Sequence, residues 1–341
     1  MSEVIAYLGF ALAAYSVVGN DVIQTLGTFL TSNEKQTKWY VLWFFAAGIL
    51  TFALVNGWYQ NDISYGRLDK FKGELPDVLE WWYLLPPIIL MVLTRAGVPV
   101  STTFMILTLF SLNSIPNDLG SMFGSLVDTD TKLGGMIQKS FMGYIAAFFT
   151  SIVVYFLITN LLEKRFINKE LEERKRKFWI AAQWGSTGFL WYQWLTQDLA
   201  NIYVYLGGGW QMSTGKFLFS VLVLTGLLAY IFYSKGGAVQ GIVRSKTNTA
   251  DIRSATFIDL IYGLIMYFFK YDLLGLWGGN LPMSTTWIFI GLLSGRELSM
   301  RFKLEGKVNM SIRKMIIRDL GKVFLGLVVS VILVFVIKMI A

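Results

Sequence analysis

The sequence predicts an all-α polytopic membrane protein made of two inverted-topology repeats of about five membrane segments each, with broken or re-entrant helices at the midplane. Composition is the first observation: 55% of the 341 residues are hydrophobic and only 15% are charged, whereas soluble proteins carry about 25% charged residues. The second is that the charges sit in blocks between apolar runs long enough to cross a bilayer. The third is that two short polar motifs occur twice, in the same order.

The apolar runs are predicted to be helices. They lack the alternation of barrel strands, and lipid offers the backbone no hydrogen bonds of its own. Several runs are short or interrupted by Gly, Pro or polar pairs. The runs lie at 4–30, 39–58, 81–94, 98–116, 136–162, 178–206, 216–234, 255–271, 282–295 and 320–340. The third with the fourth, and the eighth with the ninth, either cross singly or form re-entrant pairs, and the other loops keep the same sides in both cases.

Basic residues concentrate in alternate loops between these runs. Loops 163–177 and 296–318 each carry seven Lys or Arg and loop 235–253 carries four, whereas 117–135 carries one and 207–215 carries none. Because basic loops stay in the cytoplasm, this pattern predicts a multi-pass protein of the cell membrane with both termini extracytoplasmic. The net charge of +8 is explained by this topology signal, so membrane lipid is expected as a partner and nucleic acid is not.

A duplication divides the chain into two halves. In the first half Asn20-Asp21 precedes a Pro-x-Ser-Thr-Thr motif, with 80 residues from Asp21 to Ser101. In the second half Gln197-Asp198 precedes another such motif, with 86 residues from Asp198 to Ser284. Each half holds five runs, an odd number, so the second half starts on the opposite side of the membrane. The predicted parts are an N-terminal repeat 1–162, a charged cytoplasmic linker 163–177 and a C-terminal repeat 178–341.

The two Pro-x-Ser-Thr-Thr motifs supply hydroxyl groups where a helix is expected to begin. Proline, serine and threonine favour the first turn of a helix, and the free N–H groups of that turn attract anions. Two such starts facing each other would surround a tetrahedral oxyanion, whereas either motif alone is better explained as a helix cap. The candidate substrate-binding residues are Ser101, Thr102, Thr103, Ser284, Thr285 and Thr286.

The acid-containing motifs suit a cation. A carboxylate inside a membrane segment is unfavourable unless it is paired or solvated, and carboxylate, amide and unwound backbone oxygens are ligands for a hard cation such as sodium. The predicted cation-binding residues are Asn20, Asp21, Gln197, Asp198 and Asn201. Asp21 and Asp198 are also candidate substrate-binding residues, because a carboxylate facing the anion accepts the hydroxyl of phosphate and repels sulfate, which has none.

These motifs resemble those of the inorganic phosphate transporter (PiT) family, which carries an Asn-Asp-containing motif and a Pro-Val-Ser-Thr-Thr-His-like motif in each of two inverted halves. The matching residues are Gly19-Asn20-Asp21-Val22, Pro99-Val100-Ser101-Thr102-Thr103, Asp198-Leu199-Ala200-Asn201 and Pro282-Met283-Ser284-Thr285-Thr286. The resemblance implies a secondary active transporter that imports inorganic phosphate by cation symport and alternating access, with no cofactor. Sodium is preferred over protons as the coupled cation. Gln197, Phe104 and Trp287 depart from the family pattern, which leaves sulfate or another oxyanion open.

Other functions and features complete the expectations. The chain has no His and no Cys, which removes the usual general base and thiol nucleophile, so an intramembrane phosphate-processing enzyme is a remote alternative and a passive anion channel is a third. Asp259 is predicted to pair with a neighbouring helix. The stretch 296–318 alternates basic and apolar residues and is predicted to lie along the cytoplasmic surface. Self-association as a homodimer is left open.

Overall fold

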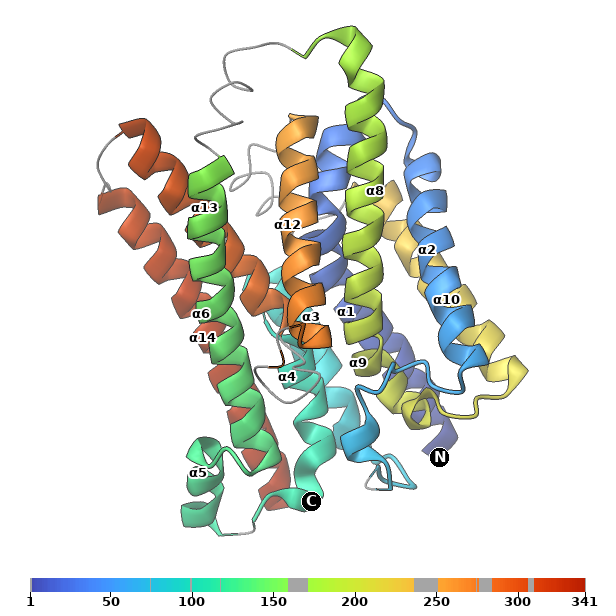
Figure 1. Ribbon diagram of the computed structural model, residues 1–341. Helices are drawn as coiled ribbons and strands as arrows, with labels where there is room; N and C mark the ends of the chain where they lie inside the picture. The colour runs from blue at the N-terminus through green and yellow to red at the C-terminus, as the bar shows by residue number, and fades with distance from the viewer. Residues whose placement is uncertain are drawn as a thin grey trace.

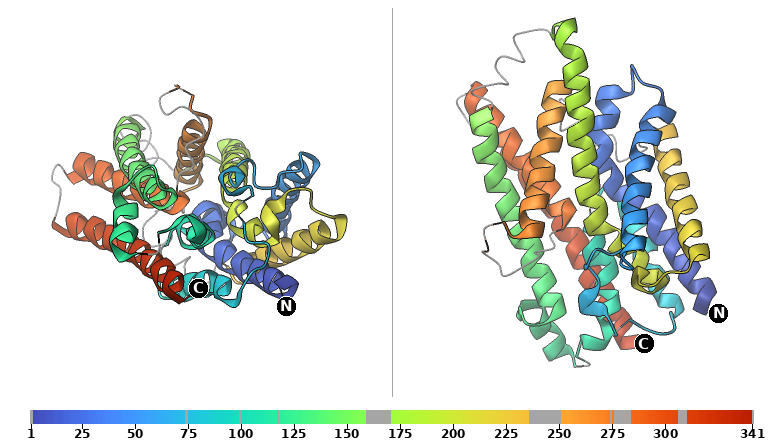
Figure 2. Two further views of the ribbon diagram at one scale, coloured as in Figure 1. Left: turned by 90° about the horizontal axis from the view of Figure 1, so that it is seen from below. Right: turned by 45° about the vertical axis from the view of Figure 1, so that its right-hand side comes forward.

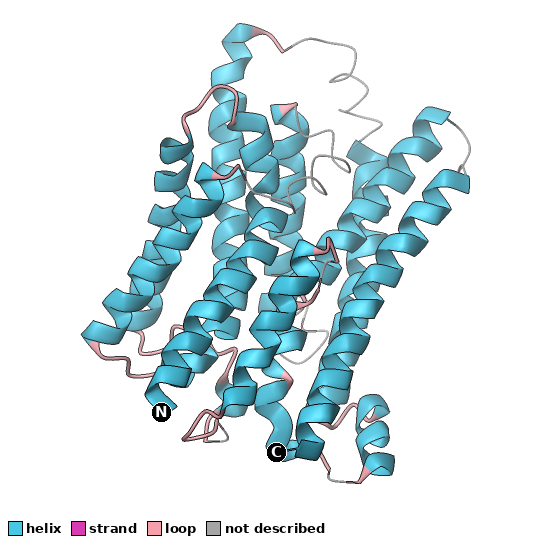
Figure 3. Cartoon of the chain, turned by 180° about the vertical axis from the view of Figure 1, so that it is seen from behind, coloured by secondary structure: helices cyan, strands magenta, loops and turns pink. Residues whose placement is uncertain are grey.

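The computed structural model describes residues 2–158, 171–235, 251–305 and 310–340, apart from 74, 99, 117, 274 and 276–283 (Figure 1). The regular secondary structure in these ranges is helical and includes no β-strand (Figure 3), and one isolated bridge joins Asp62 to Trp210. Six stretches of the described chain are long and apolar enough to cross a membrane. The predicted all-α, multi-pass architecture is confirmed.

The predicted apolar runs correspond to the helices of the structure. The first half holds α1 (Ser2–Asn33), α2 (Trp39–Tyr59), α3 (Leu85–Arg95), α4 (Thr102–Leu107) and α6 (Lys132–Ile158). The second half holds α8 (Glu173–Asp198), α10 (Thr214–Tyr233), α12 (Ile252–Tyr271), α13 (Thr285–Glu305) and α14 (Met310–Ile340). Shorter elements are the 3-10 turns η1 (Asp69–Phe71), η2 (Trp81–Leu84), η3 (Leu109–Ser114) and η5 (Val204–Gly209), with helices α5 (Leu119–Val127) and α9 (Ala200–Tyr203).

The two halves are inverted copies that interlock. Helix α1 packs on α3 as α8 packs on α12, and α1 packs on α10 as α2 packs on α8. The last helix of each half crosses to the other half, so that α6 packs along α13 and α14 packs on α4. Helix α1 starts at the end of the molecule that carries both termini, whereas α8 starts at the opposite end (Figures 1 and 2). Neither half could therefore bury its own helices fully without the other.

The third and fourth helices of each half form a re-entrant pair. Helices α3 and α4 have 11 and 6 residues, fewer than the ~20 that cross a bilayer. The chain turns between them at Gly97, which has a φ of 70°. Helix α12 enters from the opposite end and α13 leads back to it (Figure 1). Four helix ends thus meet in the interior, as the sequence predicts.

The stretch 296–318, predicted to lie along the cytoplasmic surface, is helical in its described parts, and its surface position stays a prediction. Helix α13 continues to Glu305 and α14 begins at Met310, so the stretch forms the ends of two long helices. Alternating basic and apolar residues are compatible with a helix that lies in the interface and with one that simply continues beyond it. Of the predicted linker 163–177, residues 163–170 lie outside the described residues, and 173–177 form the first turn of α8.

Candidate functional site

The first turn of α4 meets the residues just before α13 at the centre of the molecule. Ser101 caps α4, because its Oγ accepts a hydrogen bond of 3.2 Å from the backbone N–H of Phe104. Ser284 Oγ donates to Ser101 Oγ over 2.9 Å, and Thr286 Oγ1 donates to the carbonyl of Val100 over 3.0 Å. The hydroxyl-rich motifs of the two halves are therefore in direct contact. Pro99, Pro282 and Met283 of these motifs lie outside the described residues.

Two adjacent threonines of α4 hold the two acids. Thr102 Oγ1 donates to Asp21 over 2.7 Å, and Thr103 Oγ1 donates to Asp198 over 3.0 Å. Both aspartates are fully buried, with 0% of their surface exposed. Because Asp21 belongs to the first half and Asp198 to the second, one helical step in α4 connects the acid motifs of both halves. A buried carboxylate is stabilised by such hydrogen bonds.

Each asparagine of the acid motifs bonds to the aspartate of its own motif and to the chain at the start of α4. Asn20 Nδ2 donates to Asp21 over 2.6 Å and to the carbonyl of Val100 over 3.0 Å. Asn201 Nδ2 donates to Asp198 over 2.9 Å and to Thr103 over 3.0 Å. Their amide N–H groups are thus used to fix carboxylates and the start of α4. The amide oxygen of Asn20 accepts a hydrogen bond of 3.2 Å from Thr94, whereas that of Asn201 has no hydrogen-bond partner.

Three oxygens of the second acid motif are buried and have no hydrogen-bond partner: Asp198 Oδ2, Gln197 Oε1 and Asn201 Oδ1. Both carboxylate oxygens of Asp21, in contrast, accept hydrogen bonds, from Asn20 and Thr102. Buried oxygens without a donor are unfavourable, and carboxylate and amide oxygens are what a hard monovalent or divalent cation takes as ligands. The donor set of the second half therefore fits a cation.

The backbone around the acid motifs differs from the prediction. Helix α1 continues without a break through Asn20 and Asp21, so the expected unwinding is absent there. Helix α8 reaches Asp198 and only Leu199 separates it from α9. Ligands in the first half would therefore come from side chains. The expectation fails because nothing near Asn20 removes a backbone donor, as a proline would.

Thr285, the remaining predicted residue, is buried at the first turn of α13. Its carbonyl accepts a hydrogen bond of 3.0 Å from the hydroxyl of Tyr262 in α12. This bond ties the two helices of the second re-entrant pair to each other at the level of the site. Tyr262 is fully buried, and the sequence offered no pattern by which to select it.

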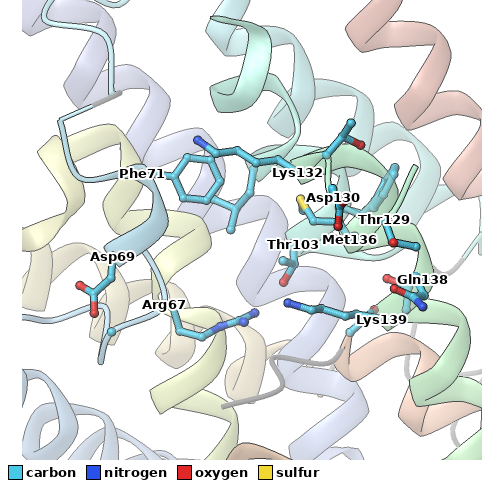
Figure 4. Close-up of a pocket in the computed structure, with 17 residues that line it drawn as sticks. Arg67, Asp69, Phe71, Thr103, Thr129, Asp130, Lys132, Met136, Gln138 and Lys139 are labelled. Atoms are coloured by element: carbon cyan, nitrogen blue, oxygen red, sulfur yellow. The ribbon is translucent and has the colours of Figure 1, made fainter. Parts of the chain in front are cut away.

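The hydroxyl groups of Ser101, Thr102, Thr103, Ser284 and Thr286 form what we call the hydroxyl cluster. A cavity of about 450 Å³ leads to it (Figure 4). Thr103 and Ser284 line it, together with the segment that follows α2 and the first turns of α6. These segments lie at the end of the molecule that carries the termini (Figure 1). The predicted site is therefore reached from that end.

Arg67 is a site residue that sequence analysis missed. It lines the cavity, its Nε donates to the carbonyl of Gln197 over 3.0 Å, and its Nη2 is buried without a hydrogen-bond partner. Burial lowers the pKa of Arg67 to about 10, against the opposing effect of Asp198, so the side chain is still a cation at neutral pH. Its only sequence signal is that it is one of three basic residues in a loop expected outside the cytoplasm.

Asp259 lies outside the cluster. Its two carboxylate oxygens accept hydrogen bonds from Thr28 of α1 and Thr187 of α8. Asp259 is fully buried, and these bonds join three helices of both halves. The prediction that it pairs with a neighbouring helix is confirmed, and its surroundings are those of a structural group.

Comparison with known proteins gives the fold an independent reference. No family model matches the chain, and no curated protein matches its sequence. A solved structure described as "The sodium-dependent phosphate transporter" superimposes with a TM-score of 0.56 at 14% sequence identity, covering 98% of this chain and 96% of that one. The chain therefore has the fold of a membrane transporter over nearly its whole length.

Proposed function

We propose that the protein is a secondary active transporter that imports inorganic phosphate across the cell membrane together with a cation, sodium in preference to protons. The observation that carries the proposal is the meeting of Ser101 and Ser284 from two inverted halves, 2.9 Å apart, beside the buried Asp21 and Asp198. Inverted-repeat transporters bind substrate and ions at such a midplane junction. The solved phosphate transporter of the same fold supports the choice of substrate and cation.

The anion would bind to the hydroxyls at the inner end of the cavity. Ser101 and Ser284 now bond to each other, so an oxyanion entering between them would exchange one hydroxyl–hydroxyl bond for donors from both halves. Hydrogen bonds to a charged acceptor are about twice as strong as neutral ones, which favours the exchange. A bound anion would then contact both halves at once, which is what coupling to a conformational change requires.

The cation would bind at the second acid motif. Its unpartnered oxygens, Asp198 Oδ2, Gln197 Oε1 and Asn201 Oδ1, supply one negative charge and two neutral ligands. A cation held there would offset the charge of a phosphate near Thr103, whose hydroxyl already bonds to Asp198. The proximity of opposite charges in a site of low dielectric couples the two binding events.

The side from which the cavity opens fits import. Loops 31–38, 163–177, 235–253 and 296–318 are rich in Lys and Arg, and the cavity opens at the other end, where the termini lie (Figure 1). If the basic loops are cytoplasmic, the cavity faces the outside. The described conformation would then be the one that receives substrate, and release would need an opening toward the basic loops.

A carrier is favoured over an enzyme. Where the motifs of the two halves meet, the polar groups are hydroxyls, amides and two carboxylates that accept hydrogen bonds from threonines, and the chain has no His or Cys to act as base or thiol nucleophile. A channel is distinguished from a carrier by accumulation of substrate against its gradient, which only coupled transport produces.

Uptake into proteoliposomes tests the function. Labelled phosphate should accumulate when sodium is high outside and low inside, and uptake should fall to background when choline replaces sodium. Asp21→Asn and Asp198→Asn should each lower the initial rate at least about tenfold, because each removes a buried charge that the hydroxyls of α4 are arranged to hold.

Two results would count against the proposal. Equal uptake without sodium would remove the sodium coupling, and repetition with a proton gradient would then decide between proton coupling and passive flow. Normal uptake by both Asp variants, at matched amounts of reconstituted protein, would disprove the assignment of the site.

A further inference from the structure

Two basic side chains face each other across the cavity. Arg67 extends from the segment after α2, and Lys139 extends from α6 on the opposite wall, and their charged ends point toward each other (Figure 4). Thr103 lies beside the gap between them, and Ser284 lines the same cavity. An anion in this gap would be attracted by both basic groups.

The segment that carries Arg67 is held in place by its own hydrogen bonds. The carboxylate of Asp62 accepts bonds from the backbone N–H groups of Ser64 at 2.9 Å and Gly66 at 2.6 Å. Ile63 and Leu68 are fully buried on either side. Arg67 therefore projects into the cavity from a fixed loop, so little conformational entropy is lost when it binds a ligand.

The guanidinium of Arg67 has a hydrogen-bond donor without a partner. Its Nε is bonded to the carbonyl of Gln197, while Nη2 is buried with no partner. Asp69, the acid closest to it in sequence, points away from the guanidinium (Figure 4). An unpaired buried donor of a charged group costs more than a neutral one, and a planar guanidinium is shaped to bind two oxygens of a phosphate or carboxylate.

More basic than acidic residues line the cavity. Three basic residues line it, Arg67, Lys132 and Lys139, against two acidic residues, Asp69 and Asp130. The basic groups are not equivalent. Lys132 lies with its Nζ 5.1 Å from the centre of the Phe71 ring, and in Figure 4 it extends toward that ring and away from the gap between Arg67 and Lys139.

We propose that Arg67 and Lys139 form an anion-binding site in the cavity, beside the hydroxyl of Thr103, which takes a tetrahedral oxyanion such as inorganic phosphate. This inference rests on the proposed function for its physiological ligand, while the binding itself does not depend on transport. The site would concentrate anions in the cavity and compensate the charge of Asp198, which would otherwise repel them.

Equilibrium binding to the purified, detergent-solubilised full chain tests the site. Labelled inorganic phosphate and labelled sulfate are titrated in sodium buffer against wild type, Arg67→Gln, Lys139→Gln and Lys132→Gln. Loss of either proposed cation should raise the Kd for phosphate on the order of tenfold, because one charge-assisted interaction is lost. Lys132→Gln removes the same charge from the same cavity and should change Kd less than about twofold. Arg67→Lys should restore part of the affinity lost in Arg67→Gln.

Each outcome decides a separate question. Equal weakening by all three Gln variants would reveal only the general field of the cavity and overturn the site, as would unchanged binding by Arg67→Gln and Lys139→Gln, even if transport is normal. Binding that needs both cations in a protein that fails to transport phosphate would keep the site and remove the proposed function. If the wild-type protein binds neither phosphate nor sulfate, both the anion-binding site and the proposed function are overturned. If Arg67→Gln does not fold, the Kd for phosphate of Lys139→Gln, compared with that of Lys132→Gln, decides whether the site exists.

Discussion

At the scale of single residues, the two buried acids are not equivalent. Asp21 has both carboxylate oxygens occupied by Asn20 and Thr102, whereas Asp198 has one oxygen without a partner. A group with a free acceptor can bind a cation or the hydroxyl of a phosphate, and a fully bonded one needs to give up a partner first. The functional difference between the halves is therefore concentrated at Asp198.

This asymmetry predicts that Asp198 controls the choice between phosphate and sulfate. In the purified protein, Asp198→Asn should weaken phosphate binding at least about tenfold and leave sulfate binding equal or stronger, because the amide no longer repels sulfate or accepts the phosphate hydroxyl as a charged group. The ratio of the two dissociation constants is the measurement, since it does not depend on the active fraction of protein.

Asp259→Asn is the matched control for that substitution. Asp259 is equally buried and accepts hydrogen bonds from two threonines, Thr28 and Thr187, but it lies outside the hydroxyl cluster. Its variant should melt at a lower temperature and keep the wild-type ratio of phosphate to sulfate affinity. The same change of ratio in both variants would contradict a specific role for Asp198.

The site residues could be predicted from the sequence only where they belong to a repeated motif. Ser101, Ser284, Asp21 and Asp198 stand out because two copies occur at similar spacing. Arg67 does not, because nothing in its own neighbourhood indicates that it points inward. Its bond to Gln197 joins residues 130 positions apart, and such a contact depends on packing between helices.

At the scale of elements, close helix contacts hold the interlocked halves. A Cβ atom at Gly291 of α13 would lie 2.9 Å from the backbone oxygen of Tyr144 and 3.0 Å from the backbone nitrogen of Phe148, both in α6. Small residues let membrane helices approach so closely that backbones touch. The crossing of α6 over to the second half therefore depends on a glycine at this position.

Gly291→Ala should destabilise the protein although alanine favours helices. The added methyl group would meet backbone atoms that cannot rotate away, at a cost of about 1–3 kcal/mol. Gly226→Ala in α10 makes the same chemical change where no atom lies within 4 Å, and it should be neutral or slightly stabilising. Thermal unfolding of both variants in detergent is the measurement. Equal melting temperatures would show that α6 and α13 can move apart without loss.

Hydropathy identifies short or interrupted membrane segments but not the ends of long helices. Runs such as 81–94 and 98–116 are recognisable as re-entrant candidates, because 81–94 is too short to cross and both contain prolines. The ends of long helices are not recognisable in the same way. Helices α13 and α14 extend well beyond their apolar parts, since backbone hydrogen bonding continues where the charges begin.

At the scale of the whole molecule, the orientation in the membrane decides whether the cavity receives substrate from outside the cell or from the cytoplasm. The segments that line the cavity lie at the end that carries both termini (Figure 2), and the helix ends that flank the basic loops lie at the other end. The direction of transport thus depends on which end faces the cytoplasm, a property that charge distribution predicts and that labelling in cells can measure.

The chain has no cysteine, so single cysteines can be introduced without background. Ser121→Cys, at an exposed position in α5 near the termini, should react with a membrane-impermeant maleimide in intact cells. Lys35→Cys, at an exposed position between α1 and α2, should react only after the cells are permeabilised. The reverse labelling pattern would mean that the protein has the opposite orientation in the membrane and that the described cavity faces the cytoplasm.

The sequence by itself determined the helices, the inverted duplication and the residue types of the candidate site, because hydropathy, loop charge and motif spacing depend on each segment's own residues and on the solvent around it. Only the tertiary structure decided that Thr102 and Thr103 divide the two acids between them, that Asp198 keeps a free oxygen and that Arg67 enters the cavity. Those facts follow from how the two halves pack against each other, and distances between helices are set by the whole assembly of side chains and are not encoded in any one segment.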